Sequence, residues 1–258
     1  MSKYATSDDL DLIENTATRL PVCIVLDCSA SMDAILDDLT GVEPTRQEFV
    51  DGQMWNIYEG DYNTYMKQAI DGINRLFKII YNDDRTRLSC EISIVAFADK
   101  PVVLSDFHTI NENEVFEDPG RGENTNLGAA VKEALNLLDA RKQKFKQTGT
   151  DYYQPWLFIF TDGDPTDKEV TVEAQKMCRE LEKARKLVPY VLTVGEGIDT
   201  EFLKGFTPNR VLSVQDEKIA EFFEWLGRSA SIVANIDDPE TKNVQMDSGF
   251  DEWLKINM

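Results

Sequence analysis

The stretch Leu20-Pro-Val-Cys-Ile-Val-Leu-Asp-Cys-Ser-Ala-Ser-Met32 decides the fold that we predict for this chain. Its apolar run from Val22 to Leu26 has no polar interruption, which is typical of a strand buried in a parallel sheet with both faces covered. The run ends in Asp27, Ser29 and Ser31, three small oxygen-bearing side chains at alternate positions. Because open α/β sheets bind ligands beyond the carboxyl ends of their strands, we expect the functional site here.

The rest of the chain alternates between strand and helix patterns. Apolar runs predict strands over 20–27, 90–97, 101–105, 156–161, 190–194 and 210–214. Helical periodicity predicts helices over 64–82, 127–147, 168–187, 199–205 and 216–232. The link between the second and third strands is too short for a parallel crossover, so these two strands form a hairpin. We therefore expect a doubly wound α/β domain, with a mostly parallel sheet and one antiparallel edge strand.

Three additions surround the predicted domain, which spans residues 20–232. Residues 1–19 form a polar N-terminal extension, and residues 233–258 form an acidic tail in which Phe250, Trp253, Leu254 and Ile256 can dock as a short amphipathic segment. Residues 33–63 form an insertion with eight acidic residues, one arginine and the aromatic residues Phe49, Trp55, Tyr58 and Tyr62. Since disordered segments are poor in aromatic residues, we expect the insertion to pack onto the body.

Charge and composition exclude some partners. The net charge of −20 argues against nucleic acid or an anionic membrane as the main partner, because both require a positive surface. The N-terminus lacks the apolar segment of a signal peptide, and no apolar run approaches the roughly 20 residues of a membrane-spanning helix. The scattered cysteines indicate reduced core residues and a cytoplasmic protein; they are Cys23, Cys28, Cys90 and Cys178.

Two further loops bring oxygen ligands to the edge of the sheet that carries Asp27. Thr125 precedes the helix 127–147, and Asp162 follows the strand 156–161. Together with Ser29 and Ser31, these residues offer two carboxylates and three hydroxyls, which suit Mg²⁺, with Mn²⁺ or Ca²⁺ as alternatives. Helix N-termini at this edge disfavour a cation, so the two carboxylates must offset them. The weakly charged ligand set favours an added carboxylate from a partner.

Other polar residues near these loops have simpler interpretations. Asp164 and Asp167 follow the same strand as Asp162, and we assign them to a turn and a helix N-cap rather than to a metal. His108 has no neighbouring His or Cys in the sequence, and we interpret it as structural or solvated.

The five candidate ligands occur in a fixed chain order: Asp27-x-Ser29-x-Ser31, then Thr125 in a Thr-Asn-Leu-Gly turn, then Asp162-Gly. This arrangement resembles the metal-ion-dependent adhesion site (MIDAS) of von Willebrand factor A domains. The resemblance covers residues 20–232. It implies that the two serines and the threonine ligate the metal, that the two aspartates ligate it directly or through water, and that the domain binds protein without catalysis. The insertion 33–63 departs from the family pattern, in which the first helix follows soon after Ser-Met.

Four segments most resemble the bacterial TerY type of this family. They are Leu-Pro-Val before the first strand, Thr-Asn-Leu-Gly-Ala-Ala, Phe-Thr-Asp-Gly-Asp-Pro-Thr-Asp and Phe-Phe-Glu-Trp-Leu. TerY proteins are linked to tellurium-resistance and stress clusters, and similar domains accompany a protein phosphatase and a kinase. The resemblance therefore implies a partner from such a cluster, which supplies an Asp or Glu side chain.

Two other functions compete with this interpretation. The first is a Mg²⁺-dependent phosphotransferase or hydrolase that uses Asp27. Phosphatases with an aspartate nucleophile resemble Asp-x-Asp at the strand end, but here the second position is Ser29, which cannot act as a general acid near neutral pH. The second is a metal-free anion site at the helix N-termini, which Asp27 and Asp162 would oppose by repulsion.

Overall fold

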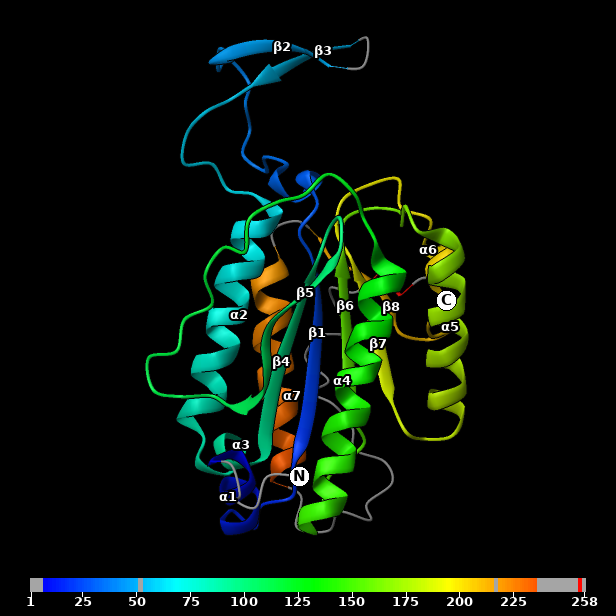
Figure 1. Ribbon diagram of the computed structural model, residues 1–258. Helices are drawn as coiled ribbons and strands as arrows, with labels where there is room; N and C mark the ends of the chain where they lie inside the picture. The colour runs from blue at the N-terminus through cyan, green and yellow to red at the C-terminus, as the bar shows by residue number, and fades with distance from the viewer. Residues whose placement is uncertain (1–6, 51–52, 216–217, 236–254, 257–258) are drawn as a thin grey trace.

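β1 (Leu20–Asp27) lies in the middle of a parallel sheet. It pairs in parallel with β4 (Cys90–Phe97) on one side and with β6 (Trp156–Thr161) on the other. β7 (Val188–Thr193) and β8 (Val211–Ser213) continue the parallel arrangement beyond β6. The carboxyl ends of β1, β4 and β6 therefore meet at one edge of the sheet (Figure 1).

Both outer strands of the sheet are antiparallel. β5 (Pro101–Thr109) pairs with β4, and the short β9 (Lys255–Ile256) pairs with β8. The computed structural model describes residues 7–50, 53–215, 218–235 and 255–256, and in this part of the chain the sheet has seven strands in the order β5-β4-β1-β6-β7-β8-β9. The predicted α/β fold with an antiparallel edge is confirmed, and β9 adds a second antiparallel edge that the sequence did not reveal.

Helices cover both faces of the sheet (Figure 1). α2 (Tyr65–Asn82) and α7 (Ile219–Ala234) pack on the face to which Val22, Ile24 and Leu26 of β1 point. α4 (Leu127–Thr148) and α5 (Lys168–Lys183) pack on the opposite face, against Cys23 and Val25. Every residue of β1 is buried, as the uninterrupted apolar run predicts.

Several boundaries differ from the predicted ones. β5 continues to Thr109 rather than ending at residue 105. α5 ends at Lys183 rather than at residue 187, and two residues later Arg185 takes a positive φ of 55°. The short helices α3 (Asp84–Ser89) and α6 (Thr200–Leu203) complete the body. The predicted start of the last helix at residue 216 and most of the tail 233–258, including Phe250 and Trp253, lie outside the described residues.

The insertion 33–63 does not pack onto the body as expected at Phe49. It contains a hairpin of β2 (Arg46–Val50) and β3 (Gln53–Ile57) that stands clear of the body (Figure 1). Phe49 and its cross-strand partner Met54 are 70% and 60% exposed, so the expected packing of Phe49 onto the body is wrong. The side chain of Trp55 lies outside the described residues.

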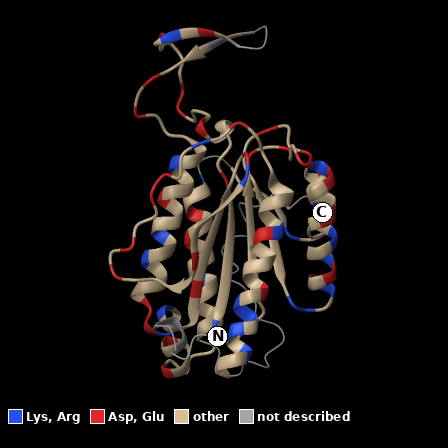
Figure 2. Ribbon diagram, viewed as in Figure 1, with Lys and Arg blue, Asp and Glu red and all other residues tan. Residues whose placement is uncertain are grey.

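The connections that carry the hairpin are tied to each other where they leave the body. Ile35 bridges to Thr64, and the Leu36 N–H donates to the Asn63 carbonyl at 2.9 Å. Acidic residues lie on both connections (Figure 2). The aromatic residues Tyr58 and Tyr62 pack edge to face against each other, with ring centroids 6.4 Å apart. The insertion is thus anchored at its base and projects beyond it.

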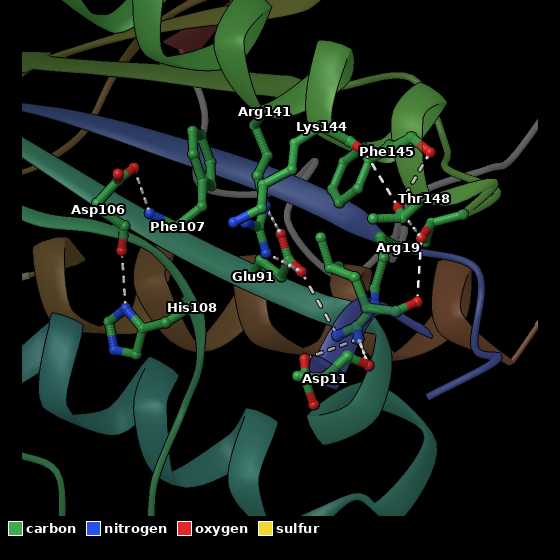
Figure 3. A network of polar contacts seen from close by, with 12 residues as sticks. Asp11, Arg19, Glu91, Asp106, Phe107, His108, Arg141, Lys144, Phe145 and Thr148 are labelled. Atoms are coloured by element: carbon green, nitrogen blue, oxygen red, sulfur yellow. Dashed lines mark hydrogen bonds and ion pairs between the residues drawn. The ribbon is translucent and has the colours of Figure 1, made fainter. Parts of the chain in front are cut away.

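The N-terminal extension is anchored at the opposite end of the sheet by a buried ionic network (Figure 3). It contains the helix α1 (Ser7–Glu14), which the sequence did not predict. Arg19 is fully buried, donates to Asp11 at 2.9 Å and lies 3.4 Å from Glu91. Glu91 also accepts two hydrogen bonds from Arg141, both at 2.7 Å. Among the described residues, no helix is both long and apolar enough to cross a membrane.

Candidate metal centre

Asp27 is a buried carboxylate at the end of β1. Its Oδ1 accepts a hydrogen bond from the Ser29 N–H at 2.8 Å, and its Oδ2 accepts one from the Thr161 hydroxyl at 2.6 Å. Both oxygens are therefore held in place by the loop after β1 and by the end of β6. Sequence reasoning missed Thr161, although its place next to Asp162 at the strand end was a usable signal.

A chain of hydrogen bonds joins the two serines to Asp162. The hydroxyls of Ser29 and Ser31 lie 3.0 Å apart, and the Ser31 hydroxyl donates to Asp162 Oδ1 at 2.9 Å. The turn that carries Ser31 is η1 (Ala30–Asp33), a single 3₁₀ turn anchored by the fully buried Met32. Four of the five predicted ligands are thus brought together at the carboxyl edge of the sheet.

Thr125, the fifth predicted ligand, is placed on the same rim through its backbone. Its N–H donates to the Thr166 hydroxyl at 3.1 Å, and its carbonyl accepts from the Thr166 N–H at 3.0 Å. Gly122, three residues earlier, is bridged to Ser29. The loop that carries Thr125 therefore lies between those that carry Ser29 and Asp162, although no hydrogen bond joins the Thr125 hydroxyl to the other four residues in the described part of the chain.

Asp164 and Asp167 have other partners. Asp164 Oδ1 accepts from the Asp199 N–H at 3.0 Å. Asp167 accepts from the N–H groups of Gly128 and Ala129 at 3.0 and 2.8 Å, so it caps α4 instead of the helix that follows it in sequence. We interpreted both residues as turn and cap residues, and these contacts agree, except that the capped helix is the neighbouring one.

Burial raises the pKa of both site carboxylates, and repulsion between them adds to the effect on Asp162. Burial raises the pKa of Asp27, and the hydrogen bonds from Ser29 and Thr161 only partly offset it. Burial, followed by repulsion from Asp27, raises the pKa of Asp162 to about 6. Two carboxylates held this way are costly while both are ionised, and a cation placed between them would relieve that cost.

The donor set fits a small divalent cation. Carboxylate and hydroxyl oxygens are the ligands that Mg²⁺, Mn²⁺ and Ca²⁺ accept, and no His or Cys competes at the rim. Cys28 lies within the motif but packs with Val22, Ile24 and Leu26, on the face opposite Asp27, as strand alternation predicts. His108, near the end of β5, contacts the Asp106 carbonyl at 2.8 Å and the Glu114 carboxylate at 2.7 Å, which agrees with its structural interpretation.

Comparison with known proteins identifies the family. The sequence matches the von Willebrand factor type A domain over residues 22–225. The vWF domain of the type V pili tip protein Mfa5 from Porphyromonas gingivalis is 10% identical, with a TM-score of 0.56, and the match covers 86% of this chain and 98% of that one. A variant of the PilB minor pilin from Streptococcus sanguinis is 12% identical, with a TM-score of 0.53 and coverage of 86% and 64%. These likenesses show the fold alone.

A third structure is more distant. Proximal thread matrix protein 1 from the mussel byssus, in a form with a zinc-occupied MIDAS motif, is 13% identical, with a TM-score of 0.48 and coverage of 84% of this chain. The present chain spans about half, 49%, of the length of that protein chain. No curated protein matches the sequence. Since the family match extends over most of the sheet and its helices, the chain belongs to the von Willebrand factor type A domain family.

Proposed function

We propose that this chain is a metal-dependent protein-binding module. Asp27, Ser29, Ser31, Thr125 and Asp162 would hold Mg²⁺, with Mn²⁺ or Ca²⁺ as substitutes, and a protein partner would contribute an Asp or Glu carboxylate to the ion. The observation that carries the proposal is the hydrogen-bonded chain that links Asp27, Ser29, Ser31 and Asp162 at one edge of the sheet.

Each residue has a distinct part in this arrangement. The hydroxyls of Ser29, Ser31 and Thr125 are neutral ligands, so the site carries only the charge of two carboxylates. A divalent cation in such a shell keeps a strong attraction for a further anion, which is the physical reason to expect a partner carboxylate. A partner that binds this way is released by EDTA and by loss of its own acidic side chain.

The sequence motifs support a more specific setting. The TerY-like segments favour a cytoplasmic bacterial protein in a stress, tellurium-resistance or phosphorylation-linked system, with a phosphatase or kinase of the same cluster as the partner. We propose residues 20–232 as the binding domain, with the 33–63 insertion and the terminal segments as additions to it. The net charge of −20 makes nucleic acid and anionic membranes poor partners.

The geometry also argues against the enzymatic alternative. A nucleophilic aspartate must reach the substrate with a free oxygen, whereas Asp27 is fully buried and both of its oxygens accept hydrogen bonds, an arrangement that still lets it hold an ion through water. Ser29 stands where an aspartate nucleophile would require a second carboxylic acid. We expect no Mg²⁺-dependent hydrolysis of p-nitrophenyl phosphate, and turnover that Asp27→Asn abolishes would revive the alternative.

Thermal unfolding with and without MgCl₂ tests the metal part of the proposal. At Mg²⁺ concentrations 100-fold above Kd, binding should stabilise the folded chain by about 2.7 kcal/mol. Replacing both Ser29 and Ser31 by alanine should remove this stabilisation. Ser105→Ala is the matched control, because its buried hydroxyl lies on β5 and has no hydrogen-bond partner among the residues that the structure describes. The proposal would be contradicted if the Tm of the wild-type chain did not change in millimolar Mg²⁺, Mn²⁺ or Ca²⁺.

A further inference from the structure

Arg121 bridges two carboxylates next to the turn that carries Ser31. Its Nε and Nη2 donate to Asp33 Oδ1 at 2.9 and 2.6 Å, and its Nη1 donates to Asp118 Oδ1 at 2.6 Å. The Arg121 side chain is only 18% exposed, although both carboxylates are about half exposed. We call Arg121, Asp33 and Asp118 the arginine clasp.

The clasp continues into a backbone attachment on Ser29. The Gly122 N–H donates to the Cys28 carbonyl at 3.0 Å, and the Ala30 N–H donates to the Gly122 carbonyl at 2.9 Å. Ser29 is therefore flanked on both sides by bonds to one loop. A side chain at position 122 would place its Cβ 2.6 Å from the Ala98 Cβ, so only glycine allows this close approach.

Asp33 lies between the turn that carries Ser31 and the insertion. Asp33 is the last residue of η1 and lies two residues after Ser31. Beyond it the chain leaves the body towards the projecting β2–β3 hairpin (Figure 1). The clasp therefore holds the end of the ligand turn at the point where the insertion departs.

We propose that Arg121 is a positioning residue that sets the ion preference of the metal site. By holding η1 through Asp33, it keeps Ser29 and Ser31 in the narrow geometry that Mg²⁺ requires. This inference rests on the proposed metal-binding function. Mg²⁺ demands nearly ideal octahedral geometry at about 2.1 Å, whereas Ca²⁺ accepts longer and less regular contacts. A loosened turn should therefore cost Mg²⁺ binding more than Ca²⁺ binding.

Electrostatics alone makes the opposite prediction. The clasp holds one cation between two anions, and replacement of Arg121 by a neutral residue leaves two uncompensated carboxylates close to the ligand turn. A purely electrostatic effect would strengthen the binding of both ions. Two measurements therefore distinguish a positioning effect of Arg121 from an effect of its charge. They are the direction of the change in Mg²⁺ affinity and the ratio of that change to the change in Ca²⁺ affinity.

Isothermal titration with MgCl₂ and with CaCl₂ tests the inference on the full chain. Arg121→Gln should weaken Mg²⁺ binding by ~10-fold or more and leave Ca²⁺ binding nearly unchanged, as expected for an outer residue that orients ligands. Arg121→Lys keeps the charge but not the planar fork, and it should show most of the same loss. The matched control is Arg87→Gln, which removes an arginine paired with Asp84 in α3 and should change neither ion.

Each outcome of the titrations has a clear meaning. Equal Mg²⁺ and Ca²⁺ changes in Arg121→Gln, or tighter binding of both ions, would overturn the positioning role and leave the proposed function intact. Failure of the wild-type chain to bind either ion would overturn both. If Arg121→Gln does not fold, Asp33→Ala removes the acceptor of the same contact from the exposed side, and its Mg²⁺ to Ca²⁺ affinity ratio should fall in the same way.

Discussion

Asp162 and Asp164 lie two residues apart in one loop and contact different parts of the molecule. Asp162 accepts from Ser31 at the proposed metal site, whereas Asp164 accepts from the backbone of Asp199. Asp162→Asn should abolish the stabilisation by Mg²⁺, which is about 2.7 kcal/mol at 100-fold excess over Kd, and Asp164→Asn should keep it. Thermal shifts of the two variants in MgCl₂ and in EDTA measure this. Loss of the shift in Asp164→Asn alone would reverse the assignment of ligand and turn residue.

The raised pKa of Asp162 predicts a pH dependence with a definite sign. Burial and Asp27 raise this pKa from 3.8 to about 6, so the metal-free folded chain binds this proton more tightly than the unfolded chain does. The proton therefore stabilises the metal-free fold fully below 3.8, and that contribution is lost as the pH rises through 6. Mg²⁺ competes with the proton, so its stabilising effect should be large at pH 7.5 and small at pH 5.

Tm measurements at several pH values, with MgCl₂ and with EDTA, follow this competition directly. In Asp162→Asn, neither the Mg²⁺ effect nor its pH dependence should remain. A Mg²⁺ shift of equal size at pH 5 and pH 7.5 would contradict the titration of Asp162 as its cause.

We expect the β2–β3 hairpin to contribute little to the stability of the body. A two-stranded hairpin has marginal stability of its own, and Phe49 and Met54 are exposed rather than packed. Replacement of residues 43–60 by a short Gly-Ser linker should change the free energy of unfolding by less than about 1 kcal/mol. Urea unfolding and the Mg²⁺ thermal shift should both stay close to wild type, because the Leu36–Asn63 contact closes the base of the insertion. Global unfolding of this variant would show that the hairpin supports the core.

The elements also show what a sequence pattern can predict. β1, β4 and β6 are long apolar runs buried on both faces, and α2 and α4 have regular apolar faces, so their positions were predicted to within a residue or two. The hairpin was missed because its described side chains at 46–49, 54 and 56 are exposed, so no alternation of buried apolar and exposed polar residues marks this part of it. Aromatic content alone suggested packing, and Phe49 contradicts that inference.

The predicted site depended on the same physics. Asp27 and Asp162 could be placed together because strands β1 and β6 end at one edge, which topology dictates once the strands are known. The contacts of the clasp residue Arg121 could not be inferred, since they join loops whose conformations no periodic pattern fixes. Thr161 could have been proposed from its place beside Asp162 at the end of β6. The cap from Asp167 to α4 was missed for the same reason, because it joins two helices far apart in sequence.

Across the whole molecule, the Arg19–Glu91–Arg141 network stabilises the end of the sheet opposite the proposed metal site (Figure 3). Glu91 is fully buried and faces two arginines, so Glu91→Gln leaves buried positive charge without its partner. We expect a loss of about 3–5 kcal/mol in the free energy of unfolding, measured in urea. Asp11→Asn, which removes a half-exposed partner of Arg19, should cost less than about 1 kcal/mol. Equal effects of the two substitutions would contradict the dominance of the buried pair.

The most direct test of the account is the position of a bound metal ion. Mn²⁺ takes the same oxygen ligands as Mg²⁺ and has a measurable anomalous signal, so a crystal of this chain soaked in MnCl₂ would locate it. The account predicts one strong anomalous peak in coordination range of the hydroxyls of Ser29, Ser31 and Thr125 and beside the carboxylates of Asp27 and Asp162. A peak at other residues, or no peak in a crystal whose site is open to solvent, would contradict it.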